Sequence, residues 1–600
     1  MGLRGIGLFE PVRTLAARAA WLVALLLLAV TAAGGVAAEP KATVPLPSLA
    51  ALTAWKPSDA PWNAAREVLR TRPTAAHPLA GVWVPPSPRQ RAKGGVIVMH
   101  DMAGGYNADQ DKYPAGTANK NLYRFTYWQY IDTFIYFSHA RVSYPPPGWT
   151  DSAHRNGVKS LGTFNIEGFT EESDQELREL LDVAARRRSY ARKLAAIARA
   201  YGFDGYLVNI ETPIPGDAGD RRRRVGALRT FVRELRREMR KVTPSATVVW
   251  YDSITRSGDL SYQNELNRRN EPFFAAADAI TVNYDWSPPD RDGSPGHSAK
   301  VAGRRARDVY SSVDAFCRQS ERRYCAFRSY LGAKPALRSG TSFGVFGPGW
   351  TYEGDGSEPD HGNFARRDRR FWTGTGGDAV PVGGIAEFVA ARPIPSDLPF
   401  STRFGQGFGD ALYEKGVVAK RGAWGNVGKI DVLPTWRDLA VAGASGYRAE
   451  LTTAAAFSGG GSLRVGAGGE PKGYSLRPLF RTAFGGVSRV TSIVREDGLA
   501  AATVLVAARP DGGGPRHVLV LLPPGKDHSP AGVRYHVRGQ VTIVHLEPTA
   551  TQHRNGWSQR TYDVSGTLGR RTVAAIGLLV YPGADAKPGA SVLLGGLDLD

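Results

Sequence analysis

The sequence has little cysteine and, after its first 38 residues, no long apolar run. Cys317 and Cys325 are the only cysteines in 600 residues, which excludes a fold that depends on a disulfide framework and a zinc site made of four cysteines. A bridge between the two stays open, because spacing along the chain does not determine the Cβ geometry that a disulfide needs. Without a second apolar run of about 20 residues, no later segment can cross a membrane as a helix.

The sequence also lacks the signatures of several enzyme classes. It has no Gly-rich phosphate loop, no closely spaced set of metal ligands and no Gly-x-Ser-x-Gly elbow. We therefore expect neither a metal nor a cofactor. The net charge of +20 is carried largely by arginine, with runs at residues 186–188 and 221–224. These runs have no interleaved aromatic residues and fall on expected helix ends and polar faces, so we expect solvated surfaces and no nucleic-acid partner.

The first 38 residues have the pattern of a secretory signal peptide. Three arginines precede an apolar segment at residues 21–30, and small residues lead to Ala38. An uncleaved membrane anchor is the alternative, but the apolar segment is short for one and two glycines follow it. We expect cleavage after Ala38 and a secreted, extracellular protein without a stable membrane anchor.

Residues 202–211 (GFDGYLVNIE) are the centre of the functional prediction. Side chains alternate along a strand, so Asn209 and Glu211 point to the same side, about 6.5 Å apart along the chain. A strand that ends in polar groups just before a Pro/Gly loop is where a parallel α/β barrel keeps its catalytic residues. The structural alternatives are a solvated carboxylate at a strand end and a turn or cap amide.

The surrounding chain alternates strand-like and helical segments. Expected strands lie at residues 95–101, 132–138, 159–166, 202–211, 246–253, 279–286, 309–316 and 341–346. One long helix is expected between Ser173 and Ala200, opened by a capping box. Eight βα units in about 260 residues predict a TIM barrel, an α/β fold. Residues 39–90 read as a linker and a segment packed on the barrel, residues 91–395 as the barrel.

After residue 395 the pattern changes to short alternating strands separated by Gly and Pro, without a helical period. Residues 396–600 therefore predict a C-terminal β-sandwich region of one or two units. The sequence leaves open whether this region binds sugar.

Seven fragments between residues 95 and 353 resemble glycoside hydrolase family 85, in the order of that family. They are residues 100–106 (HDMAGGY), 137–142 (FSHARV), Trp149 with 154–157 (HRNG), 162–167 (GTFNIE), 250–253 (WYDS), 283–286 (NYDW) and 347–353 (GPGWTYE). The resemblance implies a TIM barrel and an endo-β-N-acetylglucosaminidase that cuts N-glycans between the two core GlcNAc units. N-linked glycans or glycoproteins are then the expected partners of a monomeric enzyme.

The residue types indicate how such an enzyme would work. Two-carboxylate retaining glycosidases place an acid/base and a nucleophile about 5 Å apart, but the partner beside Glu211 is an amide that cannot attack an anomeric carbon. A 2-acetamido sugar supplies its own nucleophile and forms an oxazoline. Asn209 would hold the acetamide, Glu211 would act as acid and base, and Tyr251 matches the family tyrosine that contacts the acetamide.

Six further residues are candidates for substrate binding. Trp286 matches a family tryptophan of the sugar cleft, and Trp149, Trp350 and Tyr352 are aromatic candidates of the same type. His100 and Asp101 end the first strand and would bind mannose hydroxyls or hold the loop.

Two departures from the family pattern concern the loops. Cys317 replaces a glycine, and residues 217–224 look like an insertion after Glu211. Two alternative functions stay open. One is a two-carboxylate glycosidase in which Glu211 pairs with Glu167 or Asp252, and the other is an inactive sugar-binding barrel.

Overall fold

A computed structural model describes most of the chain. The described residues are 41–73, 83, 94–101, 104–107, 110–286, 294–318, 323–354, 361–374, 383–434, 442–443, 446–526, 529–537 and 539–600. The predicted signal peptide, residues 1–38, lies outside them. Among these residues, no helix has both the length and the apolar content that a membrane crossing needs.

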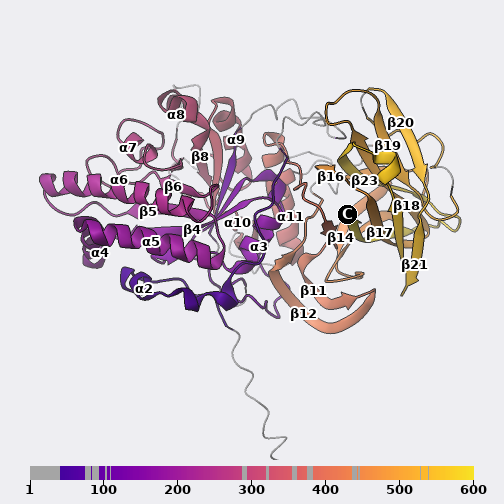
Figure 1. Ribbon diagram of the computed structural model, residues 1–600, viewed down its shortest axis with the longest axis horizontal. Helices are drawn as coiled ribbons and strands as arrows, with labels where there is room; N and C mark the ends of the chain where they lie inside the picture. The colour runs from indigo at the N-terminus through magenta and orange to yellow at the C-terminus, as the bar shows by residue number, and fades with distance from the viewer. Residues whose placement is uncertain are drawn as a thin grey trace, which may run out of the picture. The chain divides into compact units, whose positions relative to one another are not determined.

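Eight parallel strands form a closed barrel, as predicted (Figure 1). Each strand pairs with its neighbours, and β2 pairs with β4 to close the ring. The strands are β1 Val96–His100, β2 Thr133–Tyr136, β4 Lys159–Glu167, β5 Gly205–Glu211, β6 Thr247–Tyr251, β7 Ala279–Val282, β8 Val309–Asp314 and β9 Ser342–Phe346. A short strand, β3 Val142–Ser143, pairs antiparallel with β4.

Alternation along the strands separates the barrel interior from a helix-covered exterior. On β5, Val208 and Ile210 pack with the outer helices, whereas Leu207 belongs to the interior core. Asn209 and Glu211 continue the inward side toward the carboxyl end of the strand. The local period of two thus brings both polar side chains to the mouth of the barrel.

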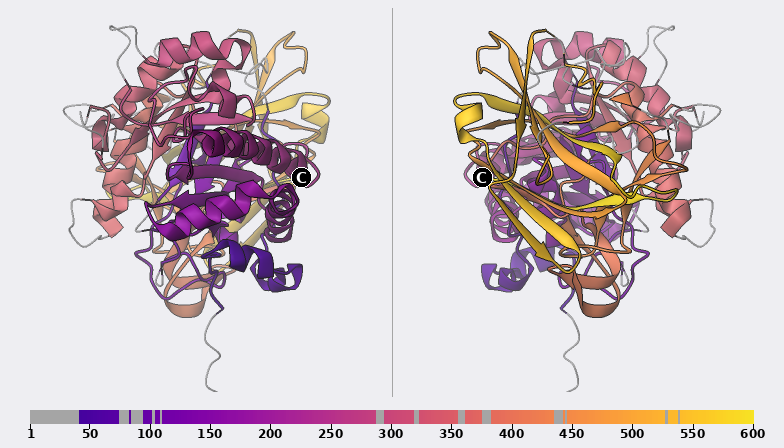
Figure 2. Two further views of the ribbon diagram at one scale, coloured as in Figure 1. Left: turned by 90° about the vertical axis from the view of Figure 1, so that its left-hand side faces the viewer. Right: turned by 90° about the vertical axis from the view of Figure 1, so that its right-hand side faces the viewer.

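Helices cover the barrel strands (Figure 2, left). They are α2 Leu49–Ala54, α3 Pro147–Arg155, α4 Glu171–Asp182, α5 Ala184–Tyr201, α6 Ala218–Arg240, α7 Glu271–Phe274, α8 Ser294–Ala302, α9 Ser329–Arg338, α10 Trp350–Glu353 and α11 His361–Thr373. The single helix expected from Ser173 to Ala200 is wrong, because Val183 is extended and divides it into α4 and α5. Thr170, not Ser173, caps α4, since the Ser173 hydroxyl donates to the Glu167 carbonyl.

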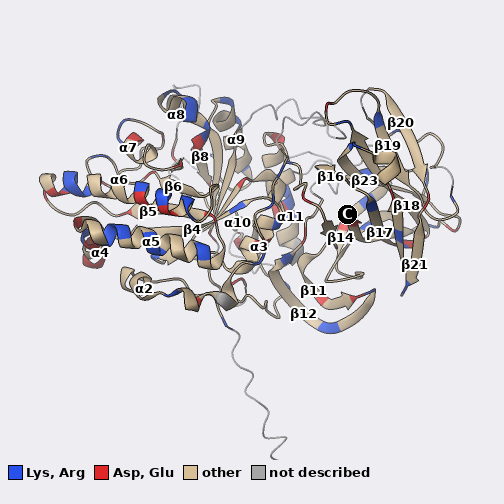
Figure 3. Ribbon diagram, in the orientation of Figure 1, with Lys and Arg blue, Asp and Glu red and all other residues tan. Residues whose placement is uncertain are grey.

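The arginine runs lie on α5 and α6, where Figure 3 shows many basic positions. Arg186, Arg188, Arg222 and Arg223 are exposed, in agreement with a solvated surface. Arg224 is an exception, because it is buried and donates hydrogen bonds to the Asp182 carboxylate. Residues 217–224 do not form an inserted loop. They are the N-cap and first turns of α6, which the Asp217 side chain begins by accepting the Asp220 amide.

The C-terminal region contains the predicted β-sandwich. One sheet runs β14-β15-β24-β17-β22-β21, with β10 beside β24; a second runs β13-β16-β23-β18-β19-β20, and β11 and β12 form a hairpin. The strands are β10 Phe400–Thr402, β11 Gln406–Glu414, β12 Val417–Ile430, β13 Ala442–Gly443, β14 Tyr447–Thr452, β15 Ser462–Ala467, β16 Ser475–Gly485, β17 Arg489–Asp497, β18 Leu499–Ala508, β19 Arg516–Leu521, β20 Val541–Leu546, β21 Ala550–Arg554, β22 Trp557–Asp563, β23 Thr572–Pro582 and β24 Ser591–Leu599. The boundary predicted at residue 395 falls between β9 and β10.

Barrel and sandwich share one apolar core. A single buried cluster contains Trp128 and Phe134 of the barrel together with Phe400 and Phe480 of the sandwich. The junction is also hydrogen-bonded, for example from Ser152 Oγ of α3 to the Val427 carbonyl at 2.5 Å. The sandwich therefore completes the hydrophobic core on this side of the barrel.

A chain truncated after residue 395 is expected to be poorly soluble. Truncation exposes the barrel's half of the shared core, and an apolar patch of more than about 400 Å² on a soluble protein favours aggregation. The measurement is the soluble fraction and melting temperature of the truncated chain beside the full chain. A soluble truncated protein with full activity would show that the sandwich is dispensable.

Candidate active site

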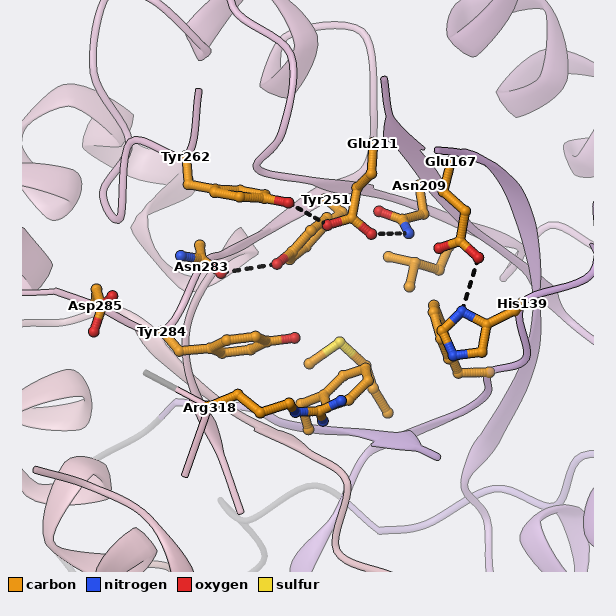
Figure 4. Close-up of a pocket in the computed structure, with 14 residues that line it drawn as sticks. His139, Glu167, Asn209, Glu211, Tyr251, Tyr262, Asn283, Tyr284, Asp285 and Arg318 are labelled. Carbon is orange, nitrogen blue, oxygen red and sulfur yellow. Dashed lines mark hydrogen bonds and ion pairs between the residues drawn. The ribbon is translucent and has the colours of Figure 1, made fainter. Parts of the chain in front are cut away.

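A pocket opens at the carboxyl ends of the barrel strands, where Asn209 and Glu211 lie (Figure 4). Its volume is about 380 Å³. It is lined by Met99, Phe137, His139, Glu167, Leu207, Asn209, Glu211, Tyr251, Tyr262, Asn283, Tyr284, Asp285, Arg318 and Phe346. All three predicted catalytic residues are among them.

Both oxygens of the Glu211 carboxylate accept hydrogen bonds. Asn209 Nδ2 donates to Oε2 at 2.7 Å, and the Tyr262 hydroxyl donates to Oε1 at 2.6 Å. Tyr262 is 40% exposed and comes from the loop between β6 and α7. A hydroxyl can exchange donor and acceptor roles, whereas an amide N–H cannot. The Oε1 side is thus the side on which Glu211 can carry a proton without losing a partner.

The Asn209 amide is buried and has one unused acceptor. Its Nδ2 donates to Glu211 and also to Asn165 Oδ1, at 3.0 Å. Its Oδ1 is buried without a hydrogen-bond partner. Because an unpaired buried carbonyl is costly, this oxygen is a ready acceptor for an N–H group that enters the pocket.

Tyr251 lies on the next strand and faces the same space. Its hydroxyl donates to Asn283 Oδ1 at 2.8 Å, and Asn283 Nδ2 donates to Asn264 Oδ1 at 2.7 Å. Burial raises the pKa of Tyr251 well above its usual value. The hydroxyl therefore stays protonated, and its one O–H is donated to Asn283.

A second carboxylate, Glu167, is paired with His139 at the pocket edge. His139 Nδ1 and Glu167 Oε1 are 2.8 Å apart. This hydrogen bond raises the His139 pKa. Burial by itself would raise the pKa of Glu167, but the hydrogen bond and charge of His139 outweigh burial and lower it. Figure 4 shows the Glu167 carboxylate turned toward His139, with the Asn209 amide between it and Glu211.

Asp252, the other carboxylate considered for a pair, does not line the pocket. It is fully buried, and burial raises its pKa to about 6. It accepts the backbone N–H groups of Gln263 and Asn264 and the Asn270 side chain. Its contacts hold the loop that presents Tyr262.

The six candidates for substrate binding are not among the lining residues. His100, Trp149, Trp286 and Tyr352 are buried, and each of them except His100 hydrogen-bonds within the protein: Trp149 to Asp111, Trp286 to the Ser312 carbonyl and Tyr352 to the Asn121 carbonyl. Asp101 bonds the Gly104 amide, and Trp350 packs on Phe327.

Strand alternation explains the position of His100. Ile97 and Met99 belong to the interior core, so His100 faces outward. There it packs among Tyr123, Phe134 and Trp149, and burial lowers its pKa to about 3. A neutral imidazole enclosed by aromatic rings cannot reach a substrate in the pocket.

Arg318 enters the pocket from the loop after β8. It forms an ion pair with Asp314, Nε to Oδ2 at 2.9 Å, and its guanidinium lies 4.9 Å from the Phe346 ring centre. The preceding residue, Cys317, is bonded to Cys325, which answers the question left open by the spacing. Cys317 has a φ of 61°, a conformation that glycine adopts most easily.

The pocket residues that the sequence analysis missed include two kinds. Phe137 and Asn283 continue the inward side of β2 and β7 beyond the strand ends, so alternation could have found them. Tyr262 and Arg318 come from irregular loops and carry no such signal. No cluster of three or more His, Cys, Asp or Glu suited to a metal ion occurs within the described part of the chain.

The chain matches the family model described as glycosyl hydrolase family 85 over residues 106–412. A cytosolic endo-beta-N-acetylglucosaminidase of Gallus gallus is 35% identical over 428 residues, 70% of this chain and 52% of the relative. Cytosolic endo-beta-N-acetylglucosaminidase 2 of Arabidopsis thaliana is 36% identical over 55% of this chain and 43% of its own length. The chain thus spans about half the length of these curated relatives.

A solved structure has the same fold. The glycoside hydrolase domain of Endo-D from Streptococcus pneumoniae R6 superposes with a TM-score of 0.72, covering 94% of this chain and 83% of that one at 22% identity. This likeness concerns the fold alone.

The prediction of a secreted, extracellular protein is contradicted by these comparisons. All six matching curated relatives are named cytosolic. That prediction rested only on the pattern of residues 1–38, which lie outside the barrel.

Proposed function

Because the chain belongs to glycosyl hydrolase family 85, we propose that it is an endo-β-N-acetylglucosaminidase acting on N-glycans of glycoproteins. It hydrolyses the β-1,4 bond between the two core GlcNAc units by a retaining, substrate-assisted mechanism. The observation that carries this proposal is the unused, buried Asn209 Oδ1 beside the Glu211 carboxylate. An acceptor at that place fits the N–H of a 2-acetamido group.

In the first step the acetamide of the substrate is the nucleophile. Asn209 Oδ1 accepts its N–H, which increases the electron density on its carbonyl oxygen. That oxygen attacks the anomeric carbon, the glycosidic C–O bond breaks, and Glu211 gives its proton to the leaving GlcNAc oxygen. Tyr251 turns its one O–H from Asn283 Oδ1 to the acetamide oxygen and orients it. The product in the pocket is an oxazolinium ion, the protonated form of an oxazoline, whose N–H remains bonded to Asn209 Oδ1.

In the second step Glu211, now ionised, acts as a general base. It takes a proton from water as the water oxygen attacks the anomeric carbon, and the oxazolinium ring opens with its N–H retained to restore the acetamide. Two inversions give net retention. A sugar hydroxyl in place of water gives transglycosylation by the same route.

A two-carboxylate glycosidase is the second candidate, because one observation favours it. Glu167 and Glu211 are direct partners across β4 and β5, and neighbouring strands lie about 4.8 Å apart, near the 5–5.5 Å that a retaining pair needs. Against it, the Glu167 carboxylate is bonded to His139 and the Asn209 amide lies between the two acids.

We expect the full chain to release free glycans from a high-mannose glycoprotein, leaving one GlcNAc on asparagine, without added metal. The residues assigned to the reaction carry a carboxylate, an amide and a phenol, and none of these groups needs a metal ion for its assigned role. Mass spectrometry of the glycan and the residual glycoprotein, with and without a chelator, is the measurement. Activity lost in the chelator and restored by a divalent ion would contradict the metal-free mechanism, whereas cleavage of β-glucosides or β-mannosides without an acetamide would favour the two-carboxylate candidate.

A further inference from the structure

The same three residues, Asn-Ile-Glu, occur on two neighbouring strands at the pocket. Residues 165–167 end β4, and residues 209–211 end β5. The strands pair in register, so that Asn165 lies beside Asn209 and Glu167 beside Glu211. The proposed mechanism uses only the β5 copy. The β4 copy is equally inward-facing and needs an explanation of its own.

Asn165 binds the catalytic amide directly. Its Oδ1 accepts a hydrogen bond from Asn209 Nδ2 at 3.0 Å, and the side chain is fully buried. If the Asn209 amide turned over, its oxygen would face Asn165 Oδ1, and two carbonyl oxygens at this distance repel. Asn165 therefore favours the orientation in which the Asn209 oxygen is the unused acceptor.

The contact with Glu211 favours the same orientation as long as its Oε2 oxygen carries no proton. A carboxylate accepts hydrogen bonds and so selects the Asn209 N–H. The first step requires a protonated Glu211, and a carboxylic acid can donate to an amide oxygen as well as accept from an N–H. A proton on Oε1, the side of Tyr262, leaves Oε2 as an acceptor for the Asn209 N–H, whereas a proton on Oε2 removes that preference. The contact with Asn165 selects the orientation of Asn209 in both cases.

The orientation of Asn165 has its own support. Asn165 and Glu167 lie two residues apart on the inward side of β4, and the Asn165 amide is among the groups that lower the pKa of Glu167. Glu167 is held ionised by His139. A turned Asn165 would bring its oxygen to the side of the negatively charged Glu167. The order His139, Glu167, Asn165, Asn209 thus forms a chain of contacts that does not depend on Glu211.

We propose that Asn165 is a positioning residue, which keeps the Asn209 oxygen directed at the substrate acetamide while Glu211 carries the proton. This inference rests on the proposed function. Asn165 touches no reacting atom and acts through Asn209, while Glu167 and His139 serve to orient Asn165. The second Asn-Ile-Glu copy is in this view a support for the first and not a second set of catalytic groups.

The test compares Asn165→Leu with Thr163→Val. Leucine has nearly the size of asparagine but accepts no hydrogen bond. Thr163 faces inward two residues earlier on β4, and its buried hydroxyl donates to the Tyr136 carbonyl at 2.9 Å, so the control removes a buried hydrogen bond without touching Asn209. Each variant is assayed for kcat and KM on a high-mannose glycopeptide, for turnover of a preformed glycan oxazoline, and for melting temperature.

Asn165→Leu is expected to lower kcat for the glycopeptide by about tenfold or more, the order found when a partner that orients a metal-binding side chain is lost. Its KM and its oxazoline turnover should change by less than about threefold, because the oxazoline has already passed the step that Asn165 supports. Thr163→Val should leave the ratio of the two activities unchanged. If Asn165→Leu does not fold, Glu167→Gln removes the charge that orients Asn165 and should give the same selective loss in weaker form.

Other outcomes overturn the inference. If Asn165→Leu lost activity equally on the glycopeptide and the oxazoline, or kept the same ratio of the two activities as Thr163→Val, Asn165 would have only a structural role. A raised KM with unchanged kcat would make it a binding residue. If the unaltered protein turns over neither substrate, the proposed function falls and this inference with it, whereas an active protein with an unselective Asn165→Leu variant refutes the inference alone.

Discussion

Asn209→Ala is expected to lose hydrolysis of the natural glycan while still turning over a preformed sugar oxazoline and transferring it to a GlcNAc acceptor. The acetamide then lacks the acceptor that directs and activates it, so the first step slows by about 10²–10³-fold, the usual effect of losing one preorganised contact to a reacting group. The oxazoline bypasses this step. The measurement is the ratio of the two activities on glycopeptide and on oxazoline.

A matched control for this variant is Asn156→Ala. Asn156 is a buried amide at the end of α3, bonded to the Ser152 carbonyl and absent from the pocket lining. Its loss should reduce the melting temperature without changing the ratio of activities. An Asn209→Ala protein that is folded but inert toward the oxazoline would contradict the assigned role, because Asn209 would then be needed after the oxazoline has formed.

Glu211→Gln is expected to fail on both substrates. The change removes the acid of the first step and the base of the second, so glycan hydrolysis and oxazoline turnover should each fall by about 10²-fold or more. Glutamine keeps the size of the side chain and can still bond Tyr262, so the fold should be retained. Single-turnover rates on the glycopeptide and on the oxazoline measure the two losses separately.

Glu167→Gln is the companion variant, since Glu167 is the neighbouring carboxylate in register with Glu211. Under substrate assistance its loss is much smaller than that of Glu211→Gln, because Glu167 acts only through Asn165. Under the two-carboxylate mechanism both variants should lose a comparable share of activity. A sugar ester trapped on Glu167 or on any other carboxylate would show that the nucleophile belongs to the enzyme, and it would contradict the oxazoline mechanism.

The pocket also bears on which glycans fit. Arg318, fixed to Asp314 and stacked near Phe346, and the exposed Tyr262 come from loops on different strands. Both line the pocket. Because these loops differ in origin from the strand residues that perform the chemistry, a change in them can alter the sugar that enters without altering the reaction.

Local pattern was enough to predict the barrel, the sandwich and the placement of Asn209 and Glu211 on one side of a strand. These features follow from alternation and from turn residues, which act over a few neighbours in the chain. Alternation also predicts that the His100 side chain points outward, because the preceding residue, Met99, faces the interior. Localisation was not determined by any of these patterns, and the inference from residues 1–38 was contradicted by the relatives.

Only the tertiary structure decided which other groups meet at Glu211. Tyr262 is 51 residues from Glu211 along the chain. It reaches the Glu211 carboxylate because the buried Asp252 accepts a backbone hydrogen bond from Asn264 and so fixes the loop that carries Tyr262. Trp286 and Trp149 resemble sugar-stacking residues in type, yet neither lines the pocket, because their indole N–H groups find partners inside the protein. Contacts of this kind depend on how distant segments pack around a barrel, and no short-range periodicity of the chain encodes them.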